Sequence, residues 1–274
     1  MINTDKINTE KRNPNTTHID RLPTLDMVTL MHNESRAAYD AIDAVLPDIA
    51  AAVDKIAEAF TNGGHLYYIG AGTSGRLGVL DASECPPTFG VDDDLVVGII
   101  AGGDKALRKS SEGAEDSFDN GYNEIKSRNL SKNDVLVGIA ASGRTPYVLG
   151  AMTAAKQAKA TVCSLSSAPG SKLDELADIK LSVDTGPEVI TGSTRLKSGT
   201  AQKLILNMLS TCAMIKTGRV YENLMICVRP TNDKLKARCA NIVSQILDVD
   251  TEKAYGLLSE NDFNIKAVIE KYKK

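Results

Sequence analysis

The sequence predicts an α/β fold in which helices cover both faces of a parallel sheet. Five short apolar runs rich in β-branched residues read as strands, at 65–69, 95–101, 135–140, 161–165 and 179–183. Helical periodicity returns after each run, and repeated strand-then-helix order is typical of parallel sheets. Glycine and hydroxyl side chains gather directly after the first, third and fifth runs, at the sheet edge where such folds bind ligands.

The start of the chain precedes this alternating pattern. Residues 1–23 show no periodicity, so we expect them to lie extended on the surface or on a partner. Helical patterns follow over 24–39 and from Pro47 to about residue 62, and a proline suits the first turn of the second helix.

The helix after the first strand begins near Arg76 and is expected to end by Cys85, because Pro86 and Pro87 should stop it. The other expected elements are helices at 104–126, 147–158, 171–176, 200–217 and from 232 onward, and a short strand at 224–228. We therefore divide the chain into an N-terminal arm with helices (1–54), a central α/β domain (55–230) and a helical C-terminal module (231–274).

Composition excludes several classes of protein. The net charge of −3 and the pI near 5.7 do not suggest a nucleic-acid partner. Five cysteines, odd in number and never spaced as Cys-x-x-Cys, indicate free thiols, and three scattered histidines offer no metal-ligand spacing. The polar first residues lack a signal-peptide core and no apolar run could span a membrane, so we expect a cytoplasmic protein without metal or cofactor.

The loop at 70–75 formally matches the Gly-x-Gly-x-x-Gly dinucleotide fingerprint. That reading requires an acidic residue after the second strand, whereas the acidic run 92–94 precedes it. Thr73, Ser74 and Gly75 at a helix start suit a compact phosphomonoester better than a pyrophosphate. The alternative is a glycine turn that only packs the helix on the strand.

Two further loops carry similar chemistry. Ser142, Gly143 and Thr145 follow the third strand, although Thr145 before Pro146 could equally be an ordinary helix cap. The loop after the fifth strand adds two hydroxyls and a positive charge near a helix start, from Ser193, Thr194 and Lys197. Helix capping is again the alternative, and it is about as well supported as ligand binding.

Two carboxylates are candidates for acid–base chemistry. Glu84 lies at the C-terminal end of its helix, where the helix dipole disfavours a negative charge. Glu115 lies early in the expected helix 104–126. From the residues alone, Glu84 is better explained as part of a frayed, exposed helix end than as a catalytic acid. Glu115 is likewise better explained as part of a solvated acidic face. The helical rise places Glu84 roughly 12–15 Å from its own phosphate loop, which suggests that it serves a second subunit in a homodimer with a shared site.

Specific blocks of sequence lie at 9–10, 12–14, 68–90, 100–103, 112–116, 138–148, 192–197 and 223–225. Together these blocks closely resemble N-acetylmuramic acid 6-phosphate etherases, which belong to the sugar isomerase (SIS) superfamily. The sequence departs from many relatives at Cys227, where they carry an acidic residue, and we do not place Cys227 in the site.

The resemblance implies a three-layer αβα sandwich with a five-stranded sheet, a homodimer that binds a sugar phosphate, and a small helical C-terminal module. It implies cleavage of the lactyl ether of N-acetylmuramic acid 6-phosphate to N-acetylglucosamine 6-phosphate and D-lactate, without metal or cofactor, in recycling of cell-wall sugar. Glu84 corresponds to the proton donor and Glu115 to a second acid/base. The alternatives are an SIS sugar-phosphate isomerase and a non-catalytic regulator that resembles glucokinase regulatory proteins.

Overall fold

The computed structural model describes residues 8–109, 111, 113–228, 230 and 232–273. The chain forms two compact units. The first contains the chain up to Ser83 and from Asp94 to Ser210, and the second contains Glu84–Asp93 and the chain from Thr211. The domain boundaries proposed from the sequence, at 54 and 230, stay a prediction.

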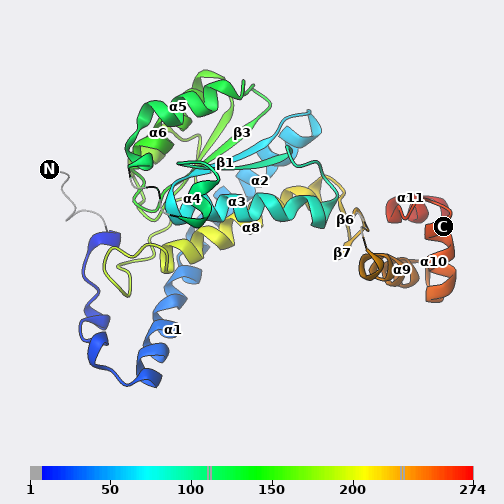
Figure 1. The fold of residues 1–274 in the computed structure, drawn as a ribbon, viewed down its shortest axis with the longest axis horizontal. Helices are drawn as coiled ribbons and strands as arrows, with labels where there is room; N and C mark the ends of the chain where they lie inside the picture. Colours follow the sequence, from blue (N-terminus) through cyan, green and yellow to red (C-terminus); the bar gives the residue numbers. More distant parts are fainter. Residues whose placement is uncertain (1–7, 110, 112, 229, 231, 274) are drawn as a thin grey trace. The chain divides into compact units, whose positions relative to one another are not determined.

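The first unit is built on a five-stranded sheet, as predicted (Figure 1). Its strands are β1 (Leu66–Gly70), β2 (Val96–Ile100), β3 (Val135–Ile139), β4 (Thr161–Leu165) and β5 (Ile179–Lys180). They are all parallel and lie in the order β2-β1-β3-β4-β5. Gly70 pairs with Ile139, so the loops that follow β1 and β3 leave the sheet side by side at the same level.

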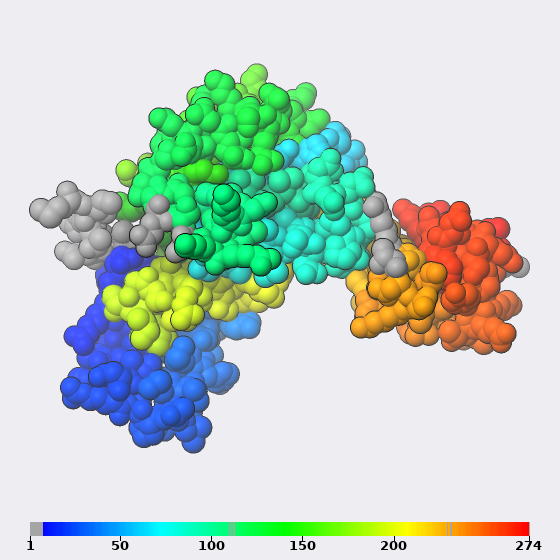
Figure 2. Space-filling model, viewed as in Figure 1, coloured from blue at the N-terminus to red at the C-terminus, as the bar shows by residue number. Residues whose placement is uncertain are grey.

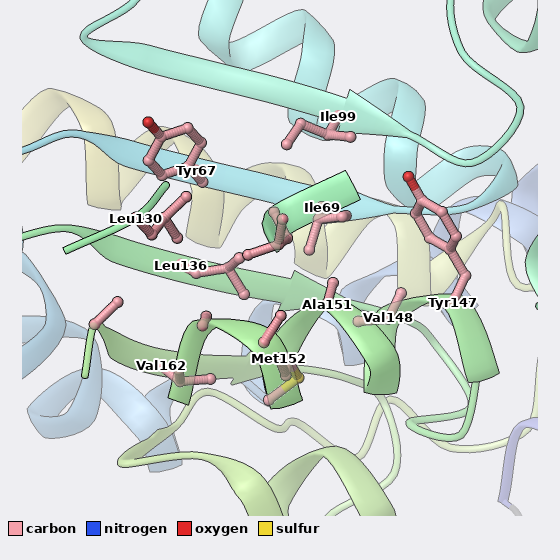
Figure 3. Close-up of a cluster of buried hydrophobic side chains, with 14 of the residues drawn as sticks. Tyr67, Ile69, Ile99, Leu130, Leu136, Tyr147, Val148, Ala151, Met152 and Val162 are labelled. Atoms are coloured by element: carbon pink, nitrogen blue, oxygen red, sulfur yellow. The ribbon is translucent and has the colours of Figure 1, made fainter. Parts of the chain in front are cut away.

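Helices cover both faces of this sheet, which confirms the three-layer prediction (Figure 1). One face packs on α5 (Phe118–Ser127) and α6 (Pro146–Gln157). Figure 3 shows Ile69, Leu136 and Met152 meeting in that buried layer. The other face carries α2 (Leu46–Thr61), α3 (Gly72–Phe89) and α8 (Lys197–Lys216).

Helix α3 is longer at both ends than the sequence indicated. It begins at Gly72, so the phosphate-loop residues form its first turn instead of preceding it. The prediction that it stops at Cys85 was wrong, because Pro86 and Pro87 lie inside its last turns. Each proline removes one backbone donor, yet the carbonyl of Pro86 still accepts a bond of 2.9 Å from the N–H of Gly90, so the helix closes normally.

The single helix predicted over 104–126 is divided into shorter elements. A short helix, α4 (Lys105–Arg108), and a 3₁₀ turn at Ala114–Asp116 precede α5. Gly113 has a φ of 80°, which the interior of a right-handed helix cannot accommodate, and Ser117 caps the start of α5 by accepting from the N–H of Asn120. Glu115 therefore lies on a 3₁₀ turn, and Glu112 of the same motif lies outside the described residues.

The N-terminal segment folds onto its own chain, contrary to the extended conformation expected from the sequence. Its described part contains 3₁₀ turns at Asn8–Glu10, Pro14–Thr16 and Ile19–Arg21, and it leads into α1 (Thr24–Asp40). The Thr16 hydroxyl donates to the Val189 carbonyl at 2.8 Å, and the Asn13 amide donates to the Pro187 carbonyl at 3.1 Å. These bonds attach the arm to the segment after β5.

Within the described residues, the second unit contains the ends of α3 and α8, a hairpin and three further helices. The hairpin pairs β6 (Val220–Tyr221) with β7 (Leu224–Met225), which is shorter than the strand predicted over 224–228. Helices α9 (Asp233–Leu247), α10 (Thr251–Ser259) and α11 (Ile265–Tyr272) form the predicted helical module, coloured orange to red in Figure 2. The hairpin side of this unit shares a hydrophobic core with these helices, through residues such as Ile226, Val243 and Leu258.

Candidate functional site

The first turn of α3 holds the residues predicted to bind phosphate. Gly75 must be glycine, because a Cβ there would lie 2.7 Å from the carbonyl oxygen of Gly70. This close approach brings the helix N-terminus directly onto the end of β1. Thr73 is partly exposed, whereas Ser74 is buried and its hydroxyl donates to Oε1 of Gln202 at 2.9 Å.

The second loop presents hydroxyls at the start of α6. Thr145 occupies the N-cap position, but its side chain makes no capping hydrogen bond. The alternative explanation, that this threonine is present as a side-chain cap, therefore finds no support in the geometry. Gly143 has a φ of 64°, and a Cβ there would lie 2.3 Å from the Cβ of Ser171, so the loop packs tightly against the segment after β4. Ser142 is half-buried.

The third loop lies next to the first. Gly199, in the first turn of α8, faces Thr73, since a Cβ on Gly199 would lie 3.5 Å from Cγ2 of Thr73 and equally far from the carbonyl of Thr194. The third loop thus joins the first at this edge, and Ser193 and Thr194 are both partly exposed.

The N-terminus of α8 is capped by a residue from outside the helix that sequence reasoning missed. Glu188 is fully buried, and its two carboxylate oxygens accept from the backbone N–H groups of Lys197 and Ser198 at 2.9 and 3.0 Å. An anion is therefore already bound at this helix start. The one sequence signal was an acidic residue among apolar neighbours shortly before a helix.

Lys197 is also engaged. Its ammonium lies 3.0 Å from Oε2 of Glu34 on α1, and the amides of Asn13 and Asn15 donate to the same carboxylate at 2.7 and 2.8 Å. Burial acts to raise the pKa of Glu34, but the hydrogen bonds from Asn15, Asn13 and Lys197 outweigh it and lower the pKa. Lys197 borders an open groove of about 600 Å³.

The two candidate acids are both exposed. Glu84 lies near the end of α3 and belongs to the second unit, whereas Glu115 lies on the 3₁₀ turn of the first unit. Ala114, next to Glu115, lines a cavity of about 260 Å³ together with Gly103 and Tyr147. Burial raises the pKa of Tyr147 to about 12, so its phenol stays protonated at neutral pH.

The described residues contain neither a metal-binding cluster nor a helix suited to span a membrane. No group of three or more His, Cys, Asp or Glu side chains is arranged to hold a metal ion in this part of the chain. Within the same residues, no helix combines the length and the apolar character needed to cross a bilayer.

Two family models match parts of the chain. Residues 48–156 match the glucokinase regulatory protein N-terminal SIS domain, and residues 121–211 match the SIS domain. Solved structures agree in fold. The phosphoheptose isomerase GmhA from Neisseria gonorrhoeae is 19% identical, with a TM-score of 0.53 over 70% of this chain and 98% of its own. A phosphoheptose isomerase from Francisella tularensis is 20% identical, with a TM-score of 0.54 and the same coverage.

Curated relatives are much closer in sequence. An N-acetylmuramic acid 6-phosphate etherase from Clostridium botulinum (strain Hall) is 53% identical over 268 residues, which are 98% of this chain and 89% of the relative. An N-acetylmuramic acid 6-phosphate etherase from Vibrio atlanticus (strain LGP32) is 55% identical over 260 residues, which are 95% of this chain and 85% of the relative.

Proposed function

Because this chain belongs to the N-acetylmuramic acid 6-phosphate etherase family, we propose that it cleaves the D-lactyl ether of N-acetylmuramic acid 6-phosphate. The products are N-acetylglucosamine 6-phosphate and D-lactate, and the step serves cytoplasmic recycling of cell-wall sugar. The observation that carries the proposal is identity above half over nearly the whole chain.

The phosphate is held at the starts of α3 and α6. Thr73, Ser74 and Gly75 supply the first turn of α3, and Ser142, Gly143 and Thr145 supply the loop before α6. Two observations support this choice. The loops follow paired strands, and the Thr145 hydroxyl makes no capping bond. Both helix N-termini favour an anion.

The third loop completes the proposed set of ligands. Ser193 and Thr194 belong to the loop that adjoins Thr73 through Gly199. Lys197 contributes by direct contact only if its ammonium leaves Glu34, because that ion pair uses it in the free chain. Glu188 already neutralises the start of α8, so the phosphate belongs at the other two helices.

The reaction proceeds by elimination and then hydration. In the open-chain sugar the lactyl oxygen on C3 is β to the C1 aldehyde, which acidifies the proton on C2. Glu115 removes that proton, and Glu84 protonates the departing lactate oxygen. Water then adds to the double bond with the roles reversed, so no external acid, base or cofactor is consumed. Each proton transfer by a positioned carboxyl group contributes about 10²–10⁴-fold.

The enzyme acts as a homodimer with shared sites. Helix α3 is continuous from Gly72 to Phe89, so a rise of about 1.5 Å per residue separates Ser74 from Glu84 by roughly 15 Å along its axis. This is long for one sugar phosphate, and Glu84 would instead serve the phosphate loop of the partner. A mixture of Glu84→Ala and Ser74→Ala chains should then regain activity, and mixed dimers without activity would refute the shared site.

A face of α1 supports self-association. Leu25, Val28 and Tyr39 are 74%, 52% and 59% exposed, and with His32 and Arg36 they form one stripe along the helix. The stripe is symmetric about His32, so an antiparallel second copy would place Leu25 on Tyr39 and Val28 on the stem of Arg36. Leu25→Glu should yield monomers in sedimentation equilibrium, whereas Leu46→Glu, an exposed leucine on α2, should not. A Leu25→Glu dimer would exclude this interface.

Lactate release from N-acetylmuramic acid 6-phosphate tests the activity, with Glu84→Gln as the inactive control. In labelled water, the product should carry solvent oxygen at C3 and solvent hydrogen at C2. Product lacking both labels would refute elimination and hydration. A ketose product without lactate would indicate an isomerase. Binding without turnover would indicate a non-catalytic sugar-phosphate-binding regulator; one matching family model is named after the glucokinase regulatory protein.

A further inference from the structure

A buried glutamine on α8, Gln202, accepts a hydrogen bond from the side chain of Ser74. The Ser74 hydroxyl donates to Oε1 of Gln202 at 2.9 Å, and the two residues are only 7% and 1% exposed. The other end of the same amide, Nε2 of Gln202, is buried and has no hydrogen-bond partner among the residues that the structure describes. Buried amide groups normally find partners, so an orphaned donor next to a proposed ligand site calls for an explanation.

The direction of this bond conflicts with phosphate binding. A fully ionised phosphate offers only acceptor oxygens, so a serine that holds it must donate its single proton to it. In the free chain that proton is used by Gln202. If the amide turns by half a rotation about its last bond, Nε2 donates to the Ser74 oxygen instead. The hydroxyl proton is then free for the phosphate, and the orphaned donor has gained a partner.

We propose that Gln202 is a positioning residue for the phosphate anchor, and that ligand binding turns its amide so that Ser74 donates to the phosphate. This inference rests on the proposed phosphate site at α3. The location of Gln202 favours such a role, because it lies one turn beyond Gly199, which faces Thr73. Glu188 fixes the first turn of this helix, so Gln202 reaches Ser74 from a rigid support.

Two substitutions of Gln202 separate this role from simple packing. Gln202→Glu keeps the size and the acceptor but removes the donor, so Ser74 stays locked as a donor to residue 202. Gln202→Met keeps the length and leaves the Ser74 proton unengaged. Asn207→Leu serves as the matched control, because Asn207 is another α8 amide that bonds an α3 side chain, Asp81, at 2.6 Å.

The probes are N-acetylglucosamine 6-phosphate and N-acetylglucosamine, with binding measured by calorimetry on the full chain. For the phosphorylated sugar, Gln202→Glu should raise Kd by roughly tenfold or more, the scale of one hydrogen bond to a charged group. Gln202→Met should raise it by about threefold or less, and Asn207→Leu should leave it unchanged. Binding of the unphosphorylated sugar should not respond to any of the three.

Gln202→Glu could also weaken binding because the new carboxylate repels the phosphate. A double-mutant cycle with Ser74→Ala separates this repulsion from the loss of the Ser74 proton. If the lost proton is the cause, Gln202→Glu should add little to the effect of Ser74→Ala. Full additivity would overturn the inference, and so would equal losses for Gln202→Met and Gln202→Glu. If Gln202→Glu does not fold, as judged by thermal unfolding, the cycle with Gln202→Met decides, because only a coupled pair is non-additive.

Failure of the proposed activity would be distinguishable from failure of this inference. A wild-type protein that binds the phosphorylated sugar but releases no lactate from its ether would refute the etherase proposal and leave the binding test intact. A wild-type protein that does not discriminate between the two sugars would refute the role of Gln202.

Discussion

The carboxylate of Glu188 should be one of the most important single groups for the stability of the first unit. It is fully buried, and it accepts from the N–H groups of Lys197 and Ser198 at 2.9 and 3.0 Å. Glu188→Gln removes the charge and turns an amide donor toward one of these N–H groups. Loss of one charge-assisted hydrogen bond costs about 1.5–3 kcal/mol. Loss of the charge at the helix N-terminus adds about 0.3–1 kcal/mol.

We therefore expect Glu188→Gln to lower the free energy of unfolding by about 2–4 kcal/mol. The assay is urea denaturation followed by far-UV circular dichroism, since the chain contains no tryptophan for fluorescence. Glu175→Gln, which changes an exposed carboxylate on α7 (Lys172–Leu176), is the matched control and should shift stability by less than about 0.5 kcal/mol. A Glu188→Gln variant as stable as this control would refute the capping role.

Thr145→Val should leave the unfolding midpoint unchanged, because the hydroxyl makes no capping bond. The same substitution should raise KM about tenfold through loss of a hydrogen bond to the phosphate. A loss of stability that accompanies the loss of affinity would contradict a ligand role for Thr145. Burial acts to raise the pKa of Asp134, but hydrogen bonds from Ser131 and His65 outweigh it and lower the pKa below its ordinary value of 3.8. The ionised carboxylate therefore stabilises the fold above that value, and this contribution is lost as the pH falls through the lower folded pKa. Asp134→Asn should flatten the acid limb of the stability curve, and an unchanged acid limb would count against this role of Asp134. Burial raises the pKa of Cys163 to about 12. Iodoacetamide at pH 8 should therefore modify the exposed Cys212 and spare Cys163 in the native protein, as measured by peptide mass spectrometry. Rapid labelling of Cys163 would show instead that β4 opens.

Local signals in the sequence were sufficient for the architecture. Apolar runs and their helical successors identified five parallel strands, because strand and helix periodicities depend on neighbours a few residues apart. The fifth strand is shorter than predicted, since only Ile179–Lys180 of the expected run 179–183 pairs in the sheet. The same reasoning failed where local rules compete. Pro86 and Pro87 are tolerated in the last turns of α3, and Gly113 interrupts a pattern that otherwise reads as one helix.

The candidate site divides in the same way. Local motifs were enough to identify the hydroxyl loops, and the family resemblance singled out Glu84 and Glu115. The folded chain was needed to show which of the proposed ligand groups already have hydrogen-bond or ion-pair partners. Ser74 meets Gln202, 128 residues away, and Lys197 meets Glu34, 163 residues away. Such partners are set by the path of the folded chain, since no spacing rule relates residues so distant. Burial then makes each pairing obligatory, because a buried polar group without a partner is costly.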